Sequence, residues 1–375
     1  MTQTITPAAP PETEAFDAFL SRYAGFAEAN NLLPVKITPF YQAKLQQEFE
    51  ALGHRNGPLN RVAYPPAERL QRDPTQSDSD FLGDRIHQKQ ADKASRAVIH
   101  KYDDRLLFMP TTACAGHCQY CFRQDYLTDG PKQSMLQFEA RLLALGEYLQ
   151  TVPNVREVIL SGGDPMTLST NQFRRIFEML KQHPTVTDIR LHTRGLVFAP
   201  QTLEDPAKIA LFKENNVRMV FHIAHPYEMC ARVEETLAKL NAAGLRLYNQ
   251  FPVLRGINDH KDVLKLLLNK LDDAHIRPLS VFAPDPVSYT HPYRVSVARL
   301  LELMDSVRRS SPAWISNVPL VFDTAFGKVY RDNMLSLNDD GTATFRRGDK
   351  EFTYPGFPPH LDVAGDAATM LWQQA

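Results

Sequence analysis

Three of the four cysteines lie in one short segment, as Cys114, Cys118 and Cys121 with the spacing C-x3-C-x2-C. Thiolates this close in the chain can converge on one soft metal centre, and cysteine ligation is how iron–sulfur clusters are held. Three ligands for a four-iron cube leave one iron open. One alternative is a zinc site, which usually closes with a fourth Cys or His and for which His117 lies nearby. The other is a chance group of free thiols. We favour a [4Fe-4S] cluster.

An open iron is what a radical enzyme needs, because S-adenosylmethionine (SAM) can chelate it and be cleaved to a radical by one electron. The cysteine spacing, with the aromatic Tyr120 directly before the third cysteine, resembles the signature of the radical SAM superfamily. An electron donor such as flavodoxin or ferredoxin is therefore expected as a protein partner.

A second segment, Gly162-Gly163-Asp164-Pro165, resembles the superfamily segment that holds the methionyl amino group of SAM. Paired glycines let the backbone approach a ligand closely, although a simple turn is the alternative. Arg194 could hold a carboxylate through its guanidinium unless it is a surface arginine, and His222 and His225 flank a strand end, where structural roles are equally plausible. The SAM site expected from these patterns comprises Gly162, Gly163, Asp164, Arg194 and His222.

From Arg105 onward, apolar strand-like runs alternate with helical patterns, which predicts parallel βαβ units. The expected strands are 106–109, 155–160, 188–191, 217–223, 245–249, 278–282 and 318–322. The clearest helix places Phe173, Ile176, Phe177 and Leu180 on one face after a Ser169 N-cap. We therefore expect an α/β fold with a partial (β/α)6-type barrel over residues 101–330. The unusual residues follow the strands, so they should meet at one mouth.

The two ends of the chain lack this alternation. Residues 1–100 are expected to form a tail over 1–14 and a helical cap or interface region, with one helix over Phe16–Phe26 and another that Thr38 caps and Gly53 ends. This region could serve contact between subunits of a homo-oligomer. Residues 331–375 are expected to form a hairpin appendage with short strands at 334–338, 342–346 and 352–354. Cys230 is expected in a helix, as an inert core residue.

Composition limits the class of protein. The chain has 375 residues, 42 basic and 43 acidic, and a formal charge of -1, so nothing points to nucleic acid or an acidic membrane. No apolar run is long enough to span a membrane, and residues 1–14 do not resemble a signal peptide. Few cysteines, mostly adjacent, argue against disulfides and for a reducing compartment. A soluble cytoplasmic protein is expected.

Several segments in order resemble lysine 2,3-aminomutases, a family within the radical SAM superfamily, over about residues 73–355. The segments are 101–105 (Lys-Tyr-Asp-Asp-Arg), 160–165, 193–194 with 200–201, 222–228, and 249–250 with 254–259. The resemblance implies an isomerase acting on a small-molecule amino acid, with pyridoxal phosphate (PLP) as second cofactor. By position, Lys328 would bind PLP covalently, and Lys101, Tyr102 and Arg105 would lie around its phosphate.

The resemblance also implies the substrate contacts. Arg123 matches the residue that holds the substrate carboxylate, and Asp285 and Asp323 match two carboxylates that receive the distal ammonium of lysine. Two acids facing one cation would select a basic side chain. The expected reaction moves the α-amino group of L-lysine or a related basic amino acid to the β-carbon.

Two departures from the family pattern leave other functions open. The glycine-rich run before the lysine is two residues shorter here, with Phe326 where a small residue belongs, and residues 286–293 are unlike the usual sequence. Phe326 could close the PLP site and leave Lys328 on the surface. One alternative is therefore a radical SAM enzyme without PLP that carries out epimerisation, dehydrogenation or peptide modification. The other is a non-enzymatic iron–sulfur or zinc protein.

Overall fold

The computed structural model describes residues 16–71, 80–88, 97–128 and 135–374. The expected tail over residues 1–14 and the loop over residues 73–78 lie outside this part of the chain. No described helix is long and apolar enough to cross a membrane.

A nine-stranded sheet in the order β1 to β9 forms the centre of the fold. Strands β2 to β8 run parallel, and β1 and β9 add antiparallel edges. Their bounds are β1 Val98–Tyr102, β2 Arg105–Thr111, β3 Glu157–Gly162, β4 Asp188–Thr193, β5 Arg218–Phe221, β6 Arg246–Pro252, β7 Arg277–Phe282, β8 Leu320–Phe322 and β9 Val329–Tyr330. Within the described residues β1 and β9 do not pair, so the sheet is open and the expected partial barrel is confirmed.

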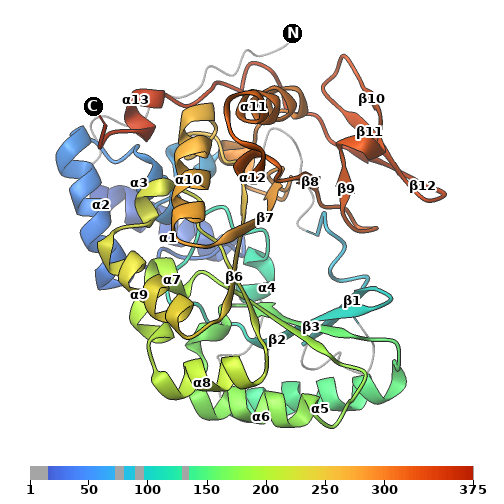
Figure 1. Cartoon of the computed structure of the whole chain (residues 1–375). Coiled ribbons are helices and arrows are strands. Elements are labelled where there is room, and N and C mark those ends of the chain that lie inside the picture. The colour runs from blue at the N-terminus through green and yellow to red at the C-terminus, as the bar shows by residue number, and fades with distance from the viewer. Residues whose placement is uncertain (1–15, 72–79, 89–96, 129–134, 375) are drawn as a thin grey trace.

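Six helices cover the outer face of the sheet, one after each of the strands β2 to β7 (Figure 1). They are α5 Met135–Thr151, α6 Thr170–Leu180, α8 Pro206–Glu214, α9 Ala231–Ala242, α10 Lys261–Asp273 and α11 Val297–Ser310. The expected features of α6 are confirmed, since Ser169 and Gln172 form a reciprocal capping box and Phe173, Ile176, Phe177 and Leu180 are buried. Cys230 differs from expectation: it is the N-cap of α9, in extended backbone, and is only partly buried.

The N-terminal helices lie against one side of the barrel, beside α9 and α10 in Figure 1. They are α1 Phe16–Ala29, α2 Pro39–Leu52 and α3 Pro58–Ala63. The side chain of Thr38 accepts from the backbone N–H of Tyr41, and Gly53 ends α2 in the left-handed region, as expected. The buried apolar residues of α2 and α3 belong to the barrel core, whereas Tyr23 and Ala27 of α1 form a small separate cluster with Leu32.

One strand region differs from the expectation. β1 was not expected, yet Val98–Tyr102 forms a hairpin with β2 across the turn at Asp103-Asp104. The three short strands expected in the C-terminal appendage form one antiparallel sheet, with β10 Met334–Leu337, β11 Ala343–Arg347 and β12 Lys350–Tyr354. Shorter helices are α4 Gln124–Thr128, α7 Gly195–Phe198, α12 Ala313–Ser316 and α13 Ala367–Met370.

Candidate active site

A pocket of about 640 Å³ opens at the carboxyl ends of the parallel strands. Its walls include every residue that the sequence assigned to the cluster, SAM, PLP and substrate, together with Asp84, Arg190, His192 and Arg347, which the sequence analysis missed. Residues from opposite ends of the chain therefore meet in one cavity, as the strand-end argument predicted.

The N-terminal region holds the cysteine loop in shape. Lys36 Nζ donates to the carbonyl of Cys114 at 2.6 Å, and the backbone N–H of His117 donates to the carbonyl of Lys36 at 2.9 Å. The His117 ring lies 2.7 Å from the carbonyl of Pro34 through Nδ1. Further along, the N–H of Gln119 donates to the carbonyl of Val62 at 2.8 Å. The loop conformation thus depends on backbone that precedes it by more than fifty residues.

Among the described residues, the three cysteines form no disulfide, and each is partly buried. Burial raises the pKa of the Cys118 thiol to about 12, although the Arg194 guanidinium lowers it. Burial, with Asp164 and the other two thiols, holds the pKa of Cys114 well above its usual value. Thiolates here need a cationic partner, which a metal centre supplies.

Among the described residues, no group of three or more His, Cys, Asp or Glu side chains is arranged to hold a metal ion. The assignment of the three cysteines to a cluster therefore stays a prediction from their spacing in the sequence.

The Gly162–Asp164 turn packs directly on the start of the cysteine loop. The N–H of Gly163 donates to Thr111 O at 3.0 Å, and the N–H of Asp164 donates to Ala113 O at 2.8 Å. A Cβ at Gly163 would lie 2.5 Å from Ala113 O, so only glycine permits this approach. The turn and the loop therefore form one wall of the pocket.

The Asp164 carboxylate is already bonded within the protein. Oδ1 accepts from Thr193 Oγ1 at 2.6 Å and from the N–H of Met166 at 2.9 Å, and Oδ2 accepts from the N–H of Arg194 at 2.9 Å. The carboxylate thereby fixes the end of β4 against the end of β3. The carboxylate oxygens have acceptor capacity left for the amino group of SAM, and this role of Asp164 stays a prediction.

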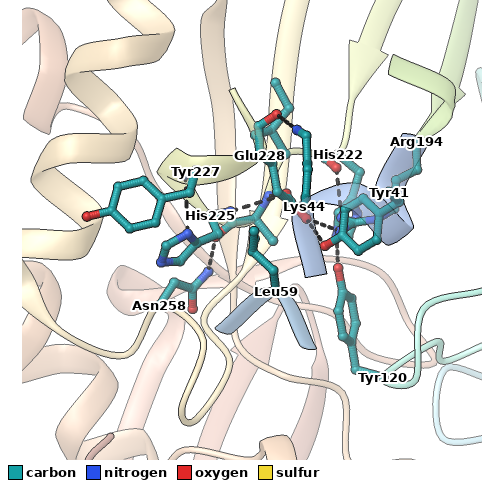
Figure 2. A network of polar contacts seen from close by, with 12 residues as sticks. Tyr41, Lys44, Leu59, Tyr120, Arg194, His222, His225, Tyr227, Glu228 and Asn258 are labelled. Carbon is teal, nitrogen blue, oxygen red and sulfur yellow. Dashed lines mark hydrogen bonds and ion pairs between the residues drawn. The ribbon is translucent and has the colours of Figure 1, made fainter. Parts of the chain in front are cut away.

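Arg194 belongs to a buried polar network rather than presenting an open fork (Figure 2). Its guanidinium donates to the Glu228 carboxylate and, through Nη1, to the carbonyl of His222 at 2.9 Å. Glu228 is 0% exposed and also accepts from Tyr41 Oη at 3.1 Å and from the N–H of Ala224 at 2.7 Å. Helix α2 thus reaches the site through Tyr41, and the SAM role of Arg194 stays a prediction.

Replacing Glu228 by alanine should destabilise the protein by about 3–5 kcal/mol, because it leaves the buried Arg194 guanidinium without its carboxylate. Urea denaturation would measure the loss. Glu235→Ala is the matched control, because the Glu235 carboxylate is exposed and forms a loose ion pair with Arg232, at 3.8 Å. This substitution should change stability by less than about 0.5 kcal/mol. Equal stability of the two variants would contradict the importance of the network.

The histidines divide into pocket and structural residues. His222 lines the pocket, and its Nε2 lies 3.0 Å from Tyr120 Oη. Burial, with the nearby Arg194 guanidinium, holds the pKa of His222 well below its usual value, so the ring is neutral at pH 7. His225 is 0% exposed and caps the turn Pro226–Glu228 by accepting from the N–H of Tyr227. His225 is therefore a structural residue.

At the other end of the pocket, Lys328 is partly buried, not a surface lysine. Its Nζ lies 4.8 Å from the centre of the Phe282 ring, and its backbone N–H donates to Tyr102 Oη at 3.2 Å. Burial lowers the pKa of its ammonium; Asp323 opposes this effect. The Phe326 side chain is 42% exposed, with Lys350 over its ring, and does not line the pocket. The expectation that Phe326 could fill the cofactor site is not supported.

The remaining charged residues pair inside the pocket. Lys101 Nζ lies 3.4 Å from Asp323 and donates to Leu82 O at 3.1 Å. Arg123 Nε lies 3.0 Å from Asp84 Oδ2. Burial and the nearby Asp323 raise the pKa of Asp285 to about 8. The Lys101 ammonium therefore pairs with an acid of the pocket, and its contact with a PLP phosphate stays a prediction.

Comparison with known proteins identifies the family of the chain. The Radical SAM superfamily model matches residues 108–267. The chain is 30% identical to the L-lysine 2,3-aminomutase of Haemophilus influenzae over 237 residues, which cover 63% of this chain and 68% of that protein. It is 28% identical to the L-lysine 2,3-aminomutase of Clostridium subterminale, over 76% of this chain and 65% of that protein. It is also 28% identical to the glutamate 2,3-aminomutase of Clostridioides difficile, again covering 76% and 65%.

The chain spans 64–65% of the length of several of these curated relatives. The radical SAM match implies a [4Fe-4S] cluster and SAM, for which the three cysteines are present at one end of the pocket. The chain belongs to the lysine 2,3-aminomutase family of radical SAM enzymes.

Proposed function

We propose that the chain is a PLP-dependent 2,3-aminomutase that moves the α-amino group of L-lysine or a related basic amino acid to the β-carbon. The observation that carries the proposal is a single pocket lined by the cysteine loop, by Lys328 and by the acids Asp285 and Asp323. Such a pocket can hold an iron–sulfur centre, a covalent cofactor and a cationic substrate together.

The cluster and SAM would be held at the cysteine end, by Cys114, Cys118 and Cys121 and by the turn from Gly162 to Asp164. When bound, they supply a carbon radical able to remove hydrogen from an unactivated carbon. The residues of the chain orient this end. Tyr120 packs against His222, with ring centres 5.7 Å apart, while buried Arg194 balances the negative charge of Glu228.

PLP would be held at the Lys328 end, where it would supply a conjugated ring that stabilises an electron-rich or radical substrate. Lys328 fits the covalent role, because burial lowers the pKa of its ammonium and raises the fraction of nucleophilic free amine. Gly327, with φ of 106°, turns the backbone so that Lys328 faces the pocket next to Tyr102.

Substrate selection would rest on the acidic wall. Asp285 and Asp323 face a space that also contains Lys101, Arg123 and Asp84. A distal ammonium would be attracted by the negative charge of Asp323 and would favour the ionised form of Asp285, whereas a distal carboxylate would be repelled by Asp323. This favours the lysine activity named for some relatives over the glutamate activity named for another.

Asp285 should make stability fall as pH rises from about 4 to 8. A carboxyl pKa of about 8 in the folded state, against about 4 when unfolded, means that the folded state holds an extra proton in this window. The free energy of unfolding should therefore fall by up to about 1.4 kcal/mol per pH unit. Urea titrations between pH 5 and 8 measure the slope, which Asp285→Asn should reduce. Asp339→Asn, in an exposed turn, should keep the wild-type slope.

The proposed function is tested by anaerobic reconstitution with iron, sulfide, SAM, PLP and reductant, followed by chromatographic assay of amino acids. β-Lysine from L-lysine, with no β-glutamate from glutamate, is the expected result.

Formation of 5′-deoxyadenosine with no PLP adduct would instead favour the PLP-free radical SAM enzyme. If neither β-lysine nor 5′-deoxyadenosine is formed, both enzyme hypotheses are rejected. A flavodoxin or ferredoxin as electron donor, a cytoplasmic location and a homo-oligomer formed through α1 to α3 are part of the same proposal.

A further inference from the structure

The C-terminal sheet places one arginine at the rim of the pocket. Arg347 is the last residue of β11, and its guanidinium donates to the carbonyl of Phe326. Its Cζ lies 5.5 Å from the centre of the Tyr102 ring. The space that a Cβ at Gly327 would need is taken by this guanidinium. Arg347 is therefore fixed against the residue that precedes Lys328.

A second arginine lies against the same ring. Arg105 Cζ is 4.8 Å from the centre of Tyr102, and its Nε pairs with Asp104, whose side chain is 59% exposed. Such surface pairs contribute little free energy. Because Tyr102 Oη accepts from the N–H of Lys328, the ring that carries both guanidiniums is also bonded to the backbone of the lysine.

Arg347 differs from the other cations here, because no carboxylate of the described residues pairs with it. Arg105 pairs with exposed Asp104, Arg190 pairs with Glu157, and Lys101 pairs with Asp323. Arg105 and Arg190 both lower the pKa of Lys328 through their positive charge. Like charges gathered around one point raise the energy of the site until an anion enters it. The chemistry of two guanidiniums beside a phenol hydroxyl suits a phosphate, which arginines bind through paired N–H donors.

We propose that Arg347, with Arg105, binds the phosphate group of PLP, so that the C-terminal sheet supplies part of the cofactor site. The inference rests on the proposed function, because PLP is taken as the source of the phosphate. In this arrangement Lys101 does not contact the phosphate but belongs to the substrate wall with Asp323. A phosphorylated substrate or free phosphate offers the same chemistry, and the experiment separates these sources.

The experiment compares PLP with pyridoxal, which has the same aldehyde but no phosphate. Each is titrated into reconstituted wild type, Arg347→Ala and Arg347→Lys, and the absorbance of the covalent lysine adduct gives the dissociation constant. Arg347→Ala should weaken PLP binding by about 10- to 100-fold, as expected for a lost hydrogen bond to a charged group, and leave pyridoxal binding unchanged. The PLP affinity of Arg347→Lys should lie between those of the wild type and Arg347→Ala, because lysine keeps the positive charge but lacks the paired N–H donors of the guanidinium.

Arg346→Ala is the matched control, because Arg346 is the neighbour on the same strand, pairs with Glu351 and does not line the pocket. It should bind both aldehydes as the wild type does. Wild-type PLP affinity in Arg347→Ala, or an equal loss of PLP and pyridoxal, would overturn the proposal.

A titration with inorganic phosphate alone, followed by calorimetry, separates this inference from the proposed function. If the wild type forms no adduct with either aldehyde but binds phosphate in a manner that Arg347→Ala abolishes, the anion site stands and the PLP part of the function fails. If neither adduct nor phosphate binding is seen, both are wrong.

Discussion

Replacing Cys118 by alanine is expected to abolish iron–sulfur binding and reduce SAM cleavage by on the order of 10⁴-fold or more, because a group essential to the chemistry has no substitute. Cys118 is the central cysteine of the loop and lies beside Tyr120 and Arg194 in the pocket wall. Iron and sulfide content, the visible spectrum, and 5′-deoxyadenosine formed under reducing anaerobic conditions measure the effect.

Cys230→Ala provides the control with the same change of side chain. Cys230 caps α9 outside the pocket, so its variant should keep the full iron content and lose at most about 1 kcal/mol of stability. A Cys118→Ala protein with a wild-type cluster spectrum would show that the cluster is not held by this loop. Iron loss from both variants would point to general instability.

Lys328→Ala should keep the cluster and the cleavage of SAM but lose the covalent PLP adduct, and with it aminomutase turnover by on the order of 10⁴-fold or more. The reason is that Lys328 is the partly buried lysine of the pocket at the Tyr102 end, with its ammonium pKa lowered by burial. Spectra with and without borohydride, which fixes the adduct irreversibly, give the readout.

Lys350→Ala is the corresponding control, since this exposed lysine lies over Phe326 only a short distance along the surface. It should form the adduct as the wild type does. Full adduct formation in Lys328→Ala would assign the covalent role to another lysine, with Lys101 the first to test because it shares the pocket.

The strand–helix alternation made most of the barrel predictable, because parallel strands buried on both faces read as apolar runs and their helices carry clear caps. β1 was missed because it is a short edge strand that precedes the repeated strand–helix units, so the strand–helix alternation does not mark it. The three short strands of the C-terminal sheet were expected, but β12 begins two residues earlier than expected, because the exposed polar residues Lys350 and Glu351 hide the start of the strand.

For the site, residue types and strand ends brought together the cysteine loop and the Gly162–Asp164 turn, and the family resemblance added Lys328, which lines the same pocket. Arg190 and His192 could have been found, since they occupy alternate positions of β4 on either side of buried Leu191. Asp84 and Arg347 come from segments outside the repeat, so no local pattern marks them. The partners of Arg194 and Lys101 could not be predicted, because long-range ion pairs depend on packing that spacing does not encode.

The support of the cysteine loop by the N-terminal region has a consequence for modularity. Cys114, Cys118 and Cys121 lie within the barrel segment, yet their loop is bonded to the backbone of Pro34, Lys36 and Val62. A barrel transplanted into another protein without this N-terminal region would carry the three cysteines but would lack the contacts that fix the conformation of their loop. The unit that would bind the cluster is therefore larger than the C-x3-C-x2-C motif, and recombination at the barrel boundary of this chain would separate the cysteines from their support.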